Sequence, residues 1–324
     1  MIDVQNVVKS YGDKLVLRGL SFQIGEGEVV GLLGLNGAGK TTTMNILTGF
    51  LSADSGTVRI GGHDILSEPK AAKKLIGYLP EQFSFYPEMR VSEYLRFCCD
   101  LKGVAAGKAE KEAHIASVCK RVGLEKMRRR MIRNLSKGYK QRVGFAQALI
   151  GDPKVLILDE PTVGLDPSQI VEIRDLIKSA GRQSTVIVSS HILSEIQAVC
   201  SRVLVIHGGR VIADGATDQL VKKLSAAHRV HTLARGDRER IKKALLSAEG
   251  VISARCLGEK EPGAFEFSAE GKEGSDIREA VSRAMAKADL PLLHAYNHVQ
   301  SLEEVFLRLV GGTAEKEDVH AGRM

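Results

Sequence analysis

The segment GLNGAGKT at residues 34–41 constrains the fold of this chain more than any other feature. It fits the pattern G-x-x-x-x-G-K-[ST], follows the apolar run at 28–33 and opens a predicted helix at 40–48. In such a loop, glycines let backbone N–H groups wrap phosphate oxygens, while the helix N-terminus adds a partial positive charge. The glycines expected to do so are Gly34, Gly37 and Gly39. The sequence therefore predicts a nucleotide phosphate site between a buried strand and a helix.

Side chains of the same loop complete this candidate site. Lys40 is expected to reach the β and γ phosphates, and the Thr41 hydroxyl can coordinate Mg²⁺. Asn36 and Thr42 are further candidate contacts to the nucleotide. The strand before the loop and the helix after it argue against an accidental match to the pattern.

Two consecutive acids end a second apolar run. VLILDE at 155–160 predicts a buried strand that delivers Asp159 and Glu160 to the carboxyl edge of a parallel sheet, where ligands of open α/β sheets bind. Asp159 is the expected partner of Mg²⁺, and Glu160 is the candidate general base for the attacking water. The competing interpretation is a pair of acids on a solvated loop. We favour a nearby cation, because acids that end an apolar run need one to offset their burial.

Length and composition are those of a soluble globular protein. At about 150 residues per domain, 324 residues with 44% hydrophobic content predict two domains. No apolar run approaches the ~18 residues needed to cross a bilayer, and the N-terminus lacks the order of a signal peptide, so a cytoplasmic location is expected. The five cysteines show no C-x-x-C spacing and are predicted to be reduced thiols without a metal site.

Strand and helix patterns divide the chain near residue 216. Residues 1–216 alternate strands, predicted at 2–8, 20–24, 28–33, 155–158 and 185–189 among others, with helices around the phosphate loop, which predicts a parallel sheet with crossover helices. Residues 217–310 follow the order strand, helix, strand, strand, helix, strand, with a turn expected at 258–263 between the middle two strands, and this order predicts a small ferredoxin-like α+β unit. A capping box at Ser301 and Glu304 predicts a last helix. Residues 311–324 lack apolar periodicity and are expected to be a disordered tail.

LSKGYKQR at 135–142 resembles the signature motif of ATP-binding-cassette (ABC) ATPases, usually written LSGGQ, with Lys137 and Tyr139 replacing Gly and Gln. From the residues alone, Ser136 is a candidate N-cap, Gly138 permits close backbone approach and a helix follows, so a second anion-binding helix end is expected. The resemblance implies that the chain binds ATP and Mg²⁺. It also implies that two such domains pair head to tail, with the signature of one chain closing on the phosphate loop of the other.

The resemblance covers about residues 1–216 and implies roles for further side chains. Tyr11 stands where the family stacks an aromatic ring on adenine, although a tyrosine in a simple turn is the alternative. Asp166 in GLDP matches the loop that crosses the dimer interface, and His191 matches the histidine that contacts the γ-phosphate. The implied fold is α/β: an ABC-type P-loop ATPase domain with a mostly parallel sheet core, an antiparallel β edge and a helical subdomain, followed by the ferredoxin-like unit.

One position departs from the family pattern. When the YP of GYLPEQFSFYPEM is aligned with the family, Glu81 falls where a glutamine is expected, and Gln82 comes one residue late. A glutamate there also resembles an exporter branch whose loop reads GYLPE. Because a carboxylate can still bind Mg²⁺, Glu81 is retained as a candidate metal ligand.

The resemblance implies the ATPase subunit of an ABC transporter, coupling the pairing of two nucleotide-binding domains to transport through a separate membrane permease. Export is favoured, because SLEEVFLRL at 301–309 also resembles the exporter branch. The expected assembly is a homodimer, peripheral at the inner face of the cell membrane. The alternative is a soluble ABC ATPase that powers assembly or repair. A non-catalytic partner is disfavoured, because the loop lysine, the paired acids and the histidine are all present.

Basic residues are concentrated in one stretch. The whole chain has a net charge of +7, and residues 120–142 hold ten basic side chains and one acidic side chain. The segment KMRRRMIR at 126–133 is either a solvated face or a contact with anionic lipid headgroups. Nucleic-acid binding is disfavoured because no aromatic residues interleave with the arginines.

Overall fold

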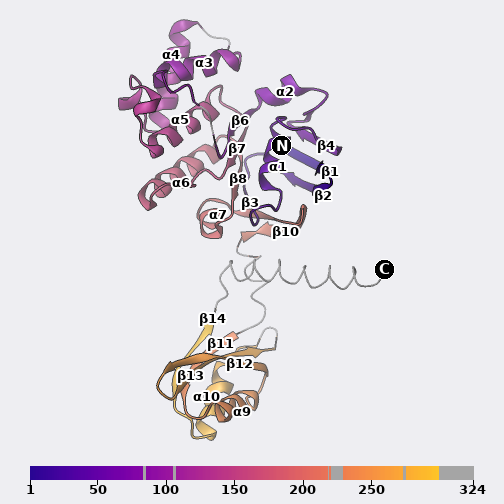
Figure 1. Ribbon diagram of the computed structural model, residues 1–324, viewed down its shortest axis with the longest axis vertical. Coiled ribbons are helices and arrows are strands. Elements are labelled where there is room, and N and C mark those ends of the chain that lie inside the picture. Colours follow the sequence, from indigo (N-terminus) through magenta and orange to yellow (C-terminus); the bar gives the residue numbers. More distant parts are fainter. Residues whose placement is uncertain (83–84, 105–106, 218, 220–228, 273–274, 299–324) are drawn as a thin grey trace. The chain divides into compact units, whose positions relative to one another are not determined.

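The computed structural model describes residues 1–82, 85–104, 107–217, 219, 229–272 and 275–298 (Figure 1). The chain divides into two compact units, Met1–Thr217 and Asp218–Met324. The helix predicted from Ser301 and the tail predicted at 311–324 lie outside the described residues.

A six-stranded sheet forms the centre of the first unit. Its order is β10-β9-β3-β8-β7-β6, and all neighbours are parallel except β10, which runs antiparallel to β9. The strands are β3 (Val29–Leu33), β6 (Ile76–Leu79), β7 (Val155–Asp159), β8 (Thr185–Ser190), β9 (Arg202–His207) and β10 (Arg210–Ala216). Every residue of β7 and β8 is buried, as expected for strands that are covered on both faces.

A separate antiparallel sheet packs against the first through a shared core. Its order is β2-β1-β4-β5, with β1 (Ile2–Tyr11), β2 (Lys14–Ile24), β4 (Ser55–Ile60) and β5 (His63–Asp64). Helix α1 (Lys40–Leu47) contacts strands of both sheets, and its Met44 and Leu47 belong to the same apolar cluster as Leu17 and Ile157. The phosphate loop is therefore anchored between two sheets.

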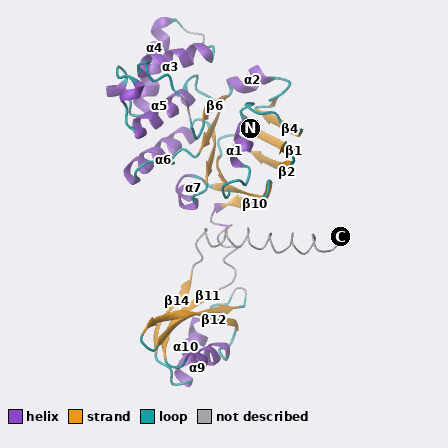
Figure 2. Ribbon diagram, in the orientation of Figure 1, coloured by secondary structure: helices purple, strands orange, loops and turns teal. Residues whose placement is uncertain are grey.

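The remaining α-helices that the structure describes in this unit pack on the parallel sheet, form a helical subdomain beside it or, in the case of the first, contact β5 of the antiparallel sheet. They are α2 (Pro69–Lys74), α3 (Val91–Leu101), α4 (Lys108–Arg121), α5 (Lys137–Leu149), α6 (Pro167–Gly181) and α7 (Leu193–Val199). Figure 2 shows α3, α4 and α5 grouped on the side of the unit away from the antiparallel sheet. Among the residues described, no helix has both the length and the apolar character required to cross a bilayer.

The second unit follows the order β-α-β-β-α-β. Its elements are β11 (Arg229–Arg235), α9 (Arg238–Leu246), β12 (Val251–Glu261), β13 (Ala264–Gly271), α10 (Arg278–Lys287) and β14 (Leu292–His298). The strands form an antiparallel sheet in the order β12-β13-β11-β14. Both helices supply buried residues to one apolar cluster with Phe267 of β13, so this unit has a core of its own.

Several sequence expectations about element bounds were wrong. Strand β6 was not predicted, because four residues without alternation carry little signal. Strand β2 begins at Lys14, although only residues 20–24 were predicted as strand. Strand β12 continues to Glu261, so the turn predicted at 258–263 is confined to its last residues. Pairing with a neighbouring strand extended both elements beyond their own apolar pattern.

Candidate nucleotide-binding and catalytic site

Four neighbouring strands of the parallel sheet deliver the candidate site residues to one edge. Strand β3 leads into the phosphate loop, β8 into His191, β7 into Glu160 and β6 into Glu81. In the register, Leu33 pairs with Ser190, and Asp159 pairs with Ser189. Because parallel strands end at the same edge, residues far apart in sequence meet there.

Glycine is required at two positions of the phosphate loop. Gly39 is the N-cap of α1 with a φ of 108°, and a Cβ there would lie 2.7 Å from Leu17. A Cβ on Gly34 would lie 2.6 Å from the carbonyl oxygen of Ile206. These positions therefore let the loop backbone pack directly on β2 and β9.

Lys40 is buried at the centre of the site, with 6% of its surface exposed. Its Nζ donates hydrogen bonds to the carbonyl oxygens of Gly34 at 2.7 Å and Leu35 at 3.4 Å. The same Nζ lies 3.6 Å from Oε1 of Glu160. A phosphate group entering the loop would compete for this ammonium group.

Glu160 occupies an unusual backbone conformation next to that lysine. Its φ is 46°, which costs a non-glycine residue roughly 1 kcal/mol and is characteristic of functional sites. Its N–H donates to Oγ of Ser189 at 2.8 Å, and Nδ1 of His191 lies 3.0 Å from each carboxylate oxygen. The Glu160 carboxylate thus sits between Lys40 and His191.

Asp159 is a buried carboxylate with one unsatisfied oxygen. It is 1% exposed and accepts a hydrogen bond from Ser189, while Oδ2 has no hydrogen-bond partner among the residues described. Burial raises the pKa of Asp159, opposed by the Ser189 hydrogen bond and reinforced by the nearby charges of Glu81 and Glu160. A buried carboxylate crowded by two others is suited to a cation.

Lys40, Glu160 and His191 border a pocket of about 370 Å³, called the phosphate pocket below. Its lining contains the loop residues Asn36, Gly37, Gly39, Lys40, Thr41 and Thr42 together with Lys14, Val16, Glu81, Glu160, Val163 and His191. Of the residues predicted for this site from sequence, Tyr11, Gly34 and Asp159 are absent from this lining, and Tyr11 is 50% exposed. Its cross-strand neighbour Lys14 and nearby Val16 line the pocket instead. Sequence analysis missed both residues, because neither belongs to a recognisable motif.

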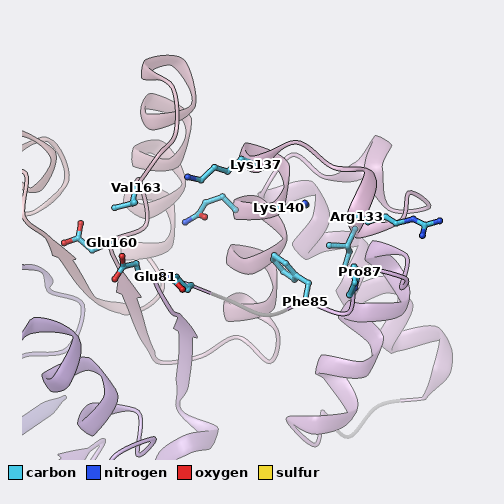
Figure 3. A pocket seen from close by; sticks show the side chains of 11 residues that line it. Glu81, Phe85, Pro87, Arg133, Lys137, Lys140, Glu160 and Val163 are labelled. Carbon is cyan, nitrogen blue, oxygen red and sulfur yellow. The ribbon is translucent and has the colours of Figure 1, made fainter. Parts of the chain in front are cut away.

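Glu81 also faces a neighbouring pocket of about 560 Å³. In Figure 3, Glu81 and Glu160 lie at the end of this pocket nearest the sheet strands. Lys137, Phe85 and Arg133 line it from the helical subdomain. Gln82 lines this second pocket and is not in the lining of the first. Of these two residues, Glu81 lines the phosphate pocket and Gln82 does not.

The residues of the signature motif, Ser136 and Gly138, lie away from the phosphate pocket. Ser136 precedes α5 as its N-cap, and Gly138 packs so closely on Gln169 that a Cβ would lie 2.6 Å from its side chain. Asp166 is the N-cap of α6, and hydrogen bonds from the Ser168 hydroxyl and the Gln169 N–H hold its pKa below the usual value. Ser136 and Gly138 line a hollow of about 230 Å³ whose lining shares no residue with the phosphate pocket.

The basic stretch is partly neutralised within the unit. Arg128 pairs with Glu112 at 3.3 Å, and Arg133 pairs with Glu88 at 2.9 Å. Lys126, Arg129 and Arg130 remain exposed.

Comparisons with known proteins agree with this architecture. Residues 17–163 match the family model described as ABC transporter. The chain is 34% identical over 319 residues to the linearmycin resistance ATP-binding protein LnrL of Bacillus subtilis (strain 168), which covers 97% of this chain and 99% of that protein. It is 39% identical over 222 residues to the Nod factor export ATP-binding protein I of Burkholderia orbicola (strain AU 1054), covering 68% of this chain and 72% of that protein.

Solved structures show the same fold. The dimeric, post-hydrolysis state of the ATP-binding cassette MJ0796 with ADP and phosphate aligns with a TM-score of 0.62 at 26% identity, covering 67% of this chain and 98% of that one. The cbiO1 protein of Clostridium perfringens, part of the ABC transporter complex cbiONQ, aligns with a TM-score of 0.60 at 29% identity, covering 69% and 94%. From its motifs, its fold and its relatives, the chain belongs to the ABC family as an ATP-binding, ATP-hydrolysing subunit of an ABC transporter.

Proposed function

We propose that this chain powers export, working as a head-to-tail homodimer beside a separate membrane permease. The observation that carries this proposal is similarity along nearly the whole length of the linearmycin resistance protein, 99% of which is covered. The shorter match to a Nod factor export protein supports export as the direction of transport. Dimerisation is supported by the MJ0796 dimer and by the separation of the signature hollow from the phosphate pocket within one chain.

We assign roles within the site from its geometry. Glu160 is the general base, because its carboxylate lies at the mouth of the phosphate loop and contacts His191. Lys40 binds the β and γ phosphates, and His191 holds the Glu160 carboxylate and contacts the γ-phosphate. Ser136, Gly138 and Asp166 of this chain are proposed to complete the nucleotide site of the partner chain. Tyr11 is proposed to contact the adenine of the nucleotide bound to its own chain.

The chain's own residues fit a bound Mg²⁺. Among the described residues, no group of three His, Cys, Asp or Glu side chains could hold a metal ion. In nucleotide sites, however, Mg²⁺ is usually bound through one or two carboxylates plus the substrate's phosphates. The free Oδ2 of Asp159, with Thr41 and Glu81 nearby, would hold it, and the ion would neutralise phosphate charge. ATP turnover that persisted after chelation of Mg²⁺ would contradict this assignment.

The proposed permease can be tested by membrane fractionation. When this chain is expressed with a candidate polytopic permease, we expect it to stay on membranes washed in 1 M salt. Expressed alone, it should keep only a salt-labile attachment, because about 1 M salt shortens the screening length to ~3 Å. The salt-labile fraction would be the chain bound to anionic headgroups through Lys126, Arg129 and Arg130. Replacing all three by Gln should remove this fraction and leave the salt-resistant binding to the permease unchanged. Equal retention with and without the membrane protein would contradict the proposal.

We also propose that the second unit stabilises the dimer or regulates coupling. A chain ending at Thr217 keeps the hydrogen bonds from Thr217 to Ser201 and Cys200 and retains the first unit's core. It should therefore bind ATP within about threefold of the full chain, because the lining of the phosphate pocket lies entirely in the first unit. Titration with a fluorescent ATP analogue and sedimentation of the dimer are the measurements. A truncated chain that folds but cannot bind ATP would refute the assignment.

A further inference from the structure

Glu195 is a buried carboxylate that the roles assigned above do not use. It lies on α7, four residues after His191, and is 8% exposed. Its Oε2 accepts hydrogen bonds from two hydroxyls, those of Thr162 and of Ser190, the latter at 3.3 Å. The Ser190 hydroxyl in turn accepts the N–H of Ile192 at 3.0 Å. A single carboxylate oxygen therefore joins two loops that are about thirty residues apart in sequence.

Both loops carry proposed site residues. Thr162 follows Glu160 by two residues, and Ser190 directly precedes His191. The turn at residues 160–162, called the Glu160 turn below, is also held by α5, because Nε2 of Gln141 donates a hydrogen bond to the Pro161 carbonyl oxygen at 2.6 Å. The left-handed backbone of Glu160 persists only if its surroundings enforce it. Besides the contacts of Glu160 itself with Ser189 and His191, Glu195 provides a buried link between this turn and the His191 loop.

We propose that Glu195 is a positioning residue that fixes the Glu160 turn and the His191 loop relative to each other. This inference rests on the proposed roles of Glu160 and His191. Hydrogen bonds from hydroxyls to a buried carboxylate are charge-assisted and strong. Without the acceptor, both hydroxyls lose this partner, and the turn after Glu160 and the His191 loop are held together only by the Glu160 contacts to Ser189 and His191 and by the pairing of β7 with β8. A displacement of about 1 Å of catalytic groups can lower a rate 10²-fold.

Substitutions at Glu195 separate positioning from general stability. Glu195→Ala should lower kcat for ATP by roughly 10- to 100-fold while KM for ATP changes less than about threefold. Glu195→Gln keeps an acceptor oxygen of the same reach for both hydroxyls, so it should retain kcat within about threefold of wild type. Gln197→Ala, an exposed position on the same helix, is the matched control and should match wild type. Rates are expressed per ATP-binding site, so that unfolded protein does not count.

A second variant covers the case in which Glu195→Ala fails to fold. Thr162→Val removes one of the two hydroxyls at nearly constant shape and should lower kcat in the same direction. Added to Glu195→Ala, it should cause little further loss, because the interaction is already broken. Unchanged kcat in Glu195→Ala and Thr162→Val would overturn the inference, as would Glu195→Gln failing like Glu195→Ala. Normal turnover in Glu160→Gln would instead overturn the proposed function, so the two failures are distinguishable.

Discussion

Glu160→Gln is expected to lower ATP turnover by about 10²- to 10⁴-fold, the usual contribution of a general base. The amide has the same shape but cannot take a proton from the attacking water. ATP binding should persist or tighten, because the variant loses a negative charge 3.6 Å from Lys40 that competes with the phosphates. Phosphate release measures turnover, and equilibrium titration with a fluorescent ATP analogue measures binding.

A trapped state should accompany this loss of turnover. With ATP and Mg²⁺, the variant should accumulate as a dimer, since hydrolysis no longer separates the two chains. Glu125→Gln makes the same chemical change at an exposed position in the helical subdomain and should turn over like wild type. Turnover of Glu160→Gln at the wild-type rate would show that another group takes the proton.

The location of the candidate site could be predicted because its residues follow apolar runs. Runs that end in the phosphate loop, in Asp159 and in His191 read as buried parallel strands, and such strands finish at one edge. That argument needs no knowledge of which strands are neighbours. It predicts that the residues following these strands lie close together, and Lys40, Glu160 and His191 do line the same pocket.

The contacts inside the site could not be predicted, because they depend on strand register. Ser189 bonds the Glu160 N–H and Asp159 only because β8 pairs with β7 in one particular register. Glu195 reads as an ordinary polar residue of a helix until the fold brings it to Thr162. A sequence pattern reports the face on which a side chain lies, whereas hydrogen bonding also requires the neighbouring element to be known.

The proposed head-to-tail pairing leads to the second large effect, which is recovery of activity from two inactive chains. Lys40→Ala removes the phosphate contact of one chain, and Ser136→Arg blocks the signature hollow of the other. In a mixed dimer, one site contains both lesions and the other contains neither. Because half of the dimers are mixed and each has one intact site, an equal mixture should recover about a quarter of wild-type turnover if the sites act independently.

A different pair of lesions provides the matched control. Lys40→Ala and Glu160→Gln lie in the same pocket of one chain, so in their mixed dimer every site keeps one lesion, and no activity should return. Recovery in the first mixture and none in the second requires each site to combine the phosphate pocket of one chain with the signature hollow of the other. Equal behaviour of the two mixtures, with mixed dimers shown to form by two affinity tags, would mean that the composite sites are wrong or that the two sites are strictly coupled. Wild-type hydrolysis should also rise faster than linearly with chain concentration, because a lone chain holds the two halves of a site in separate pockets.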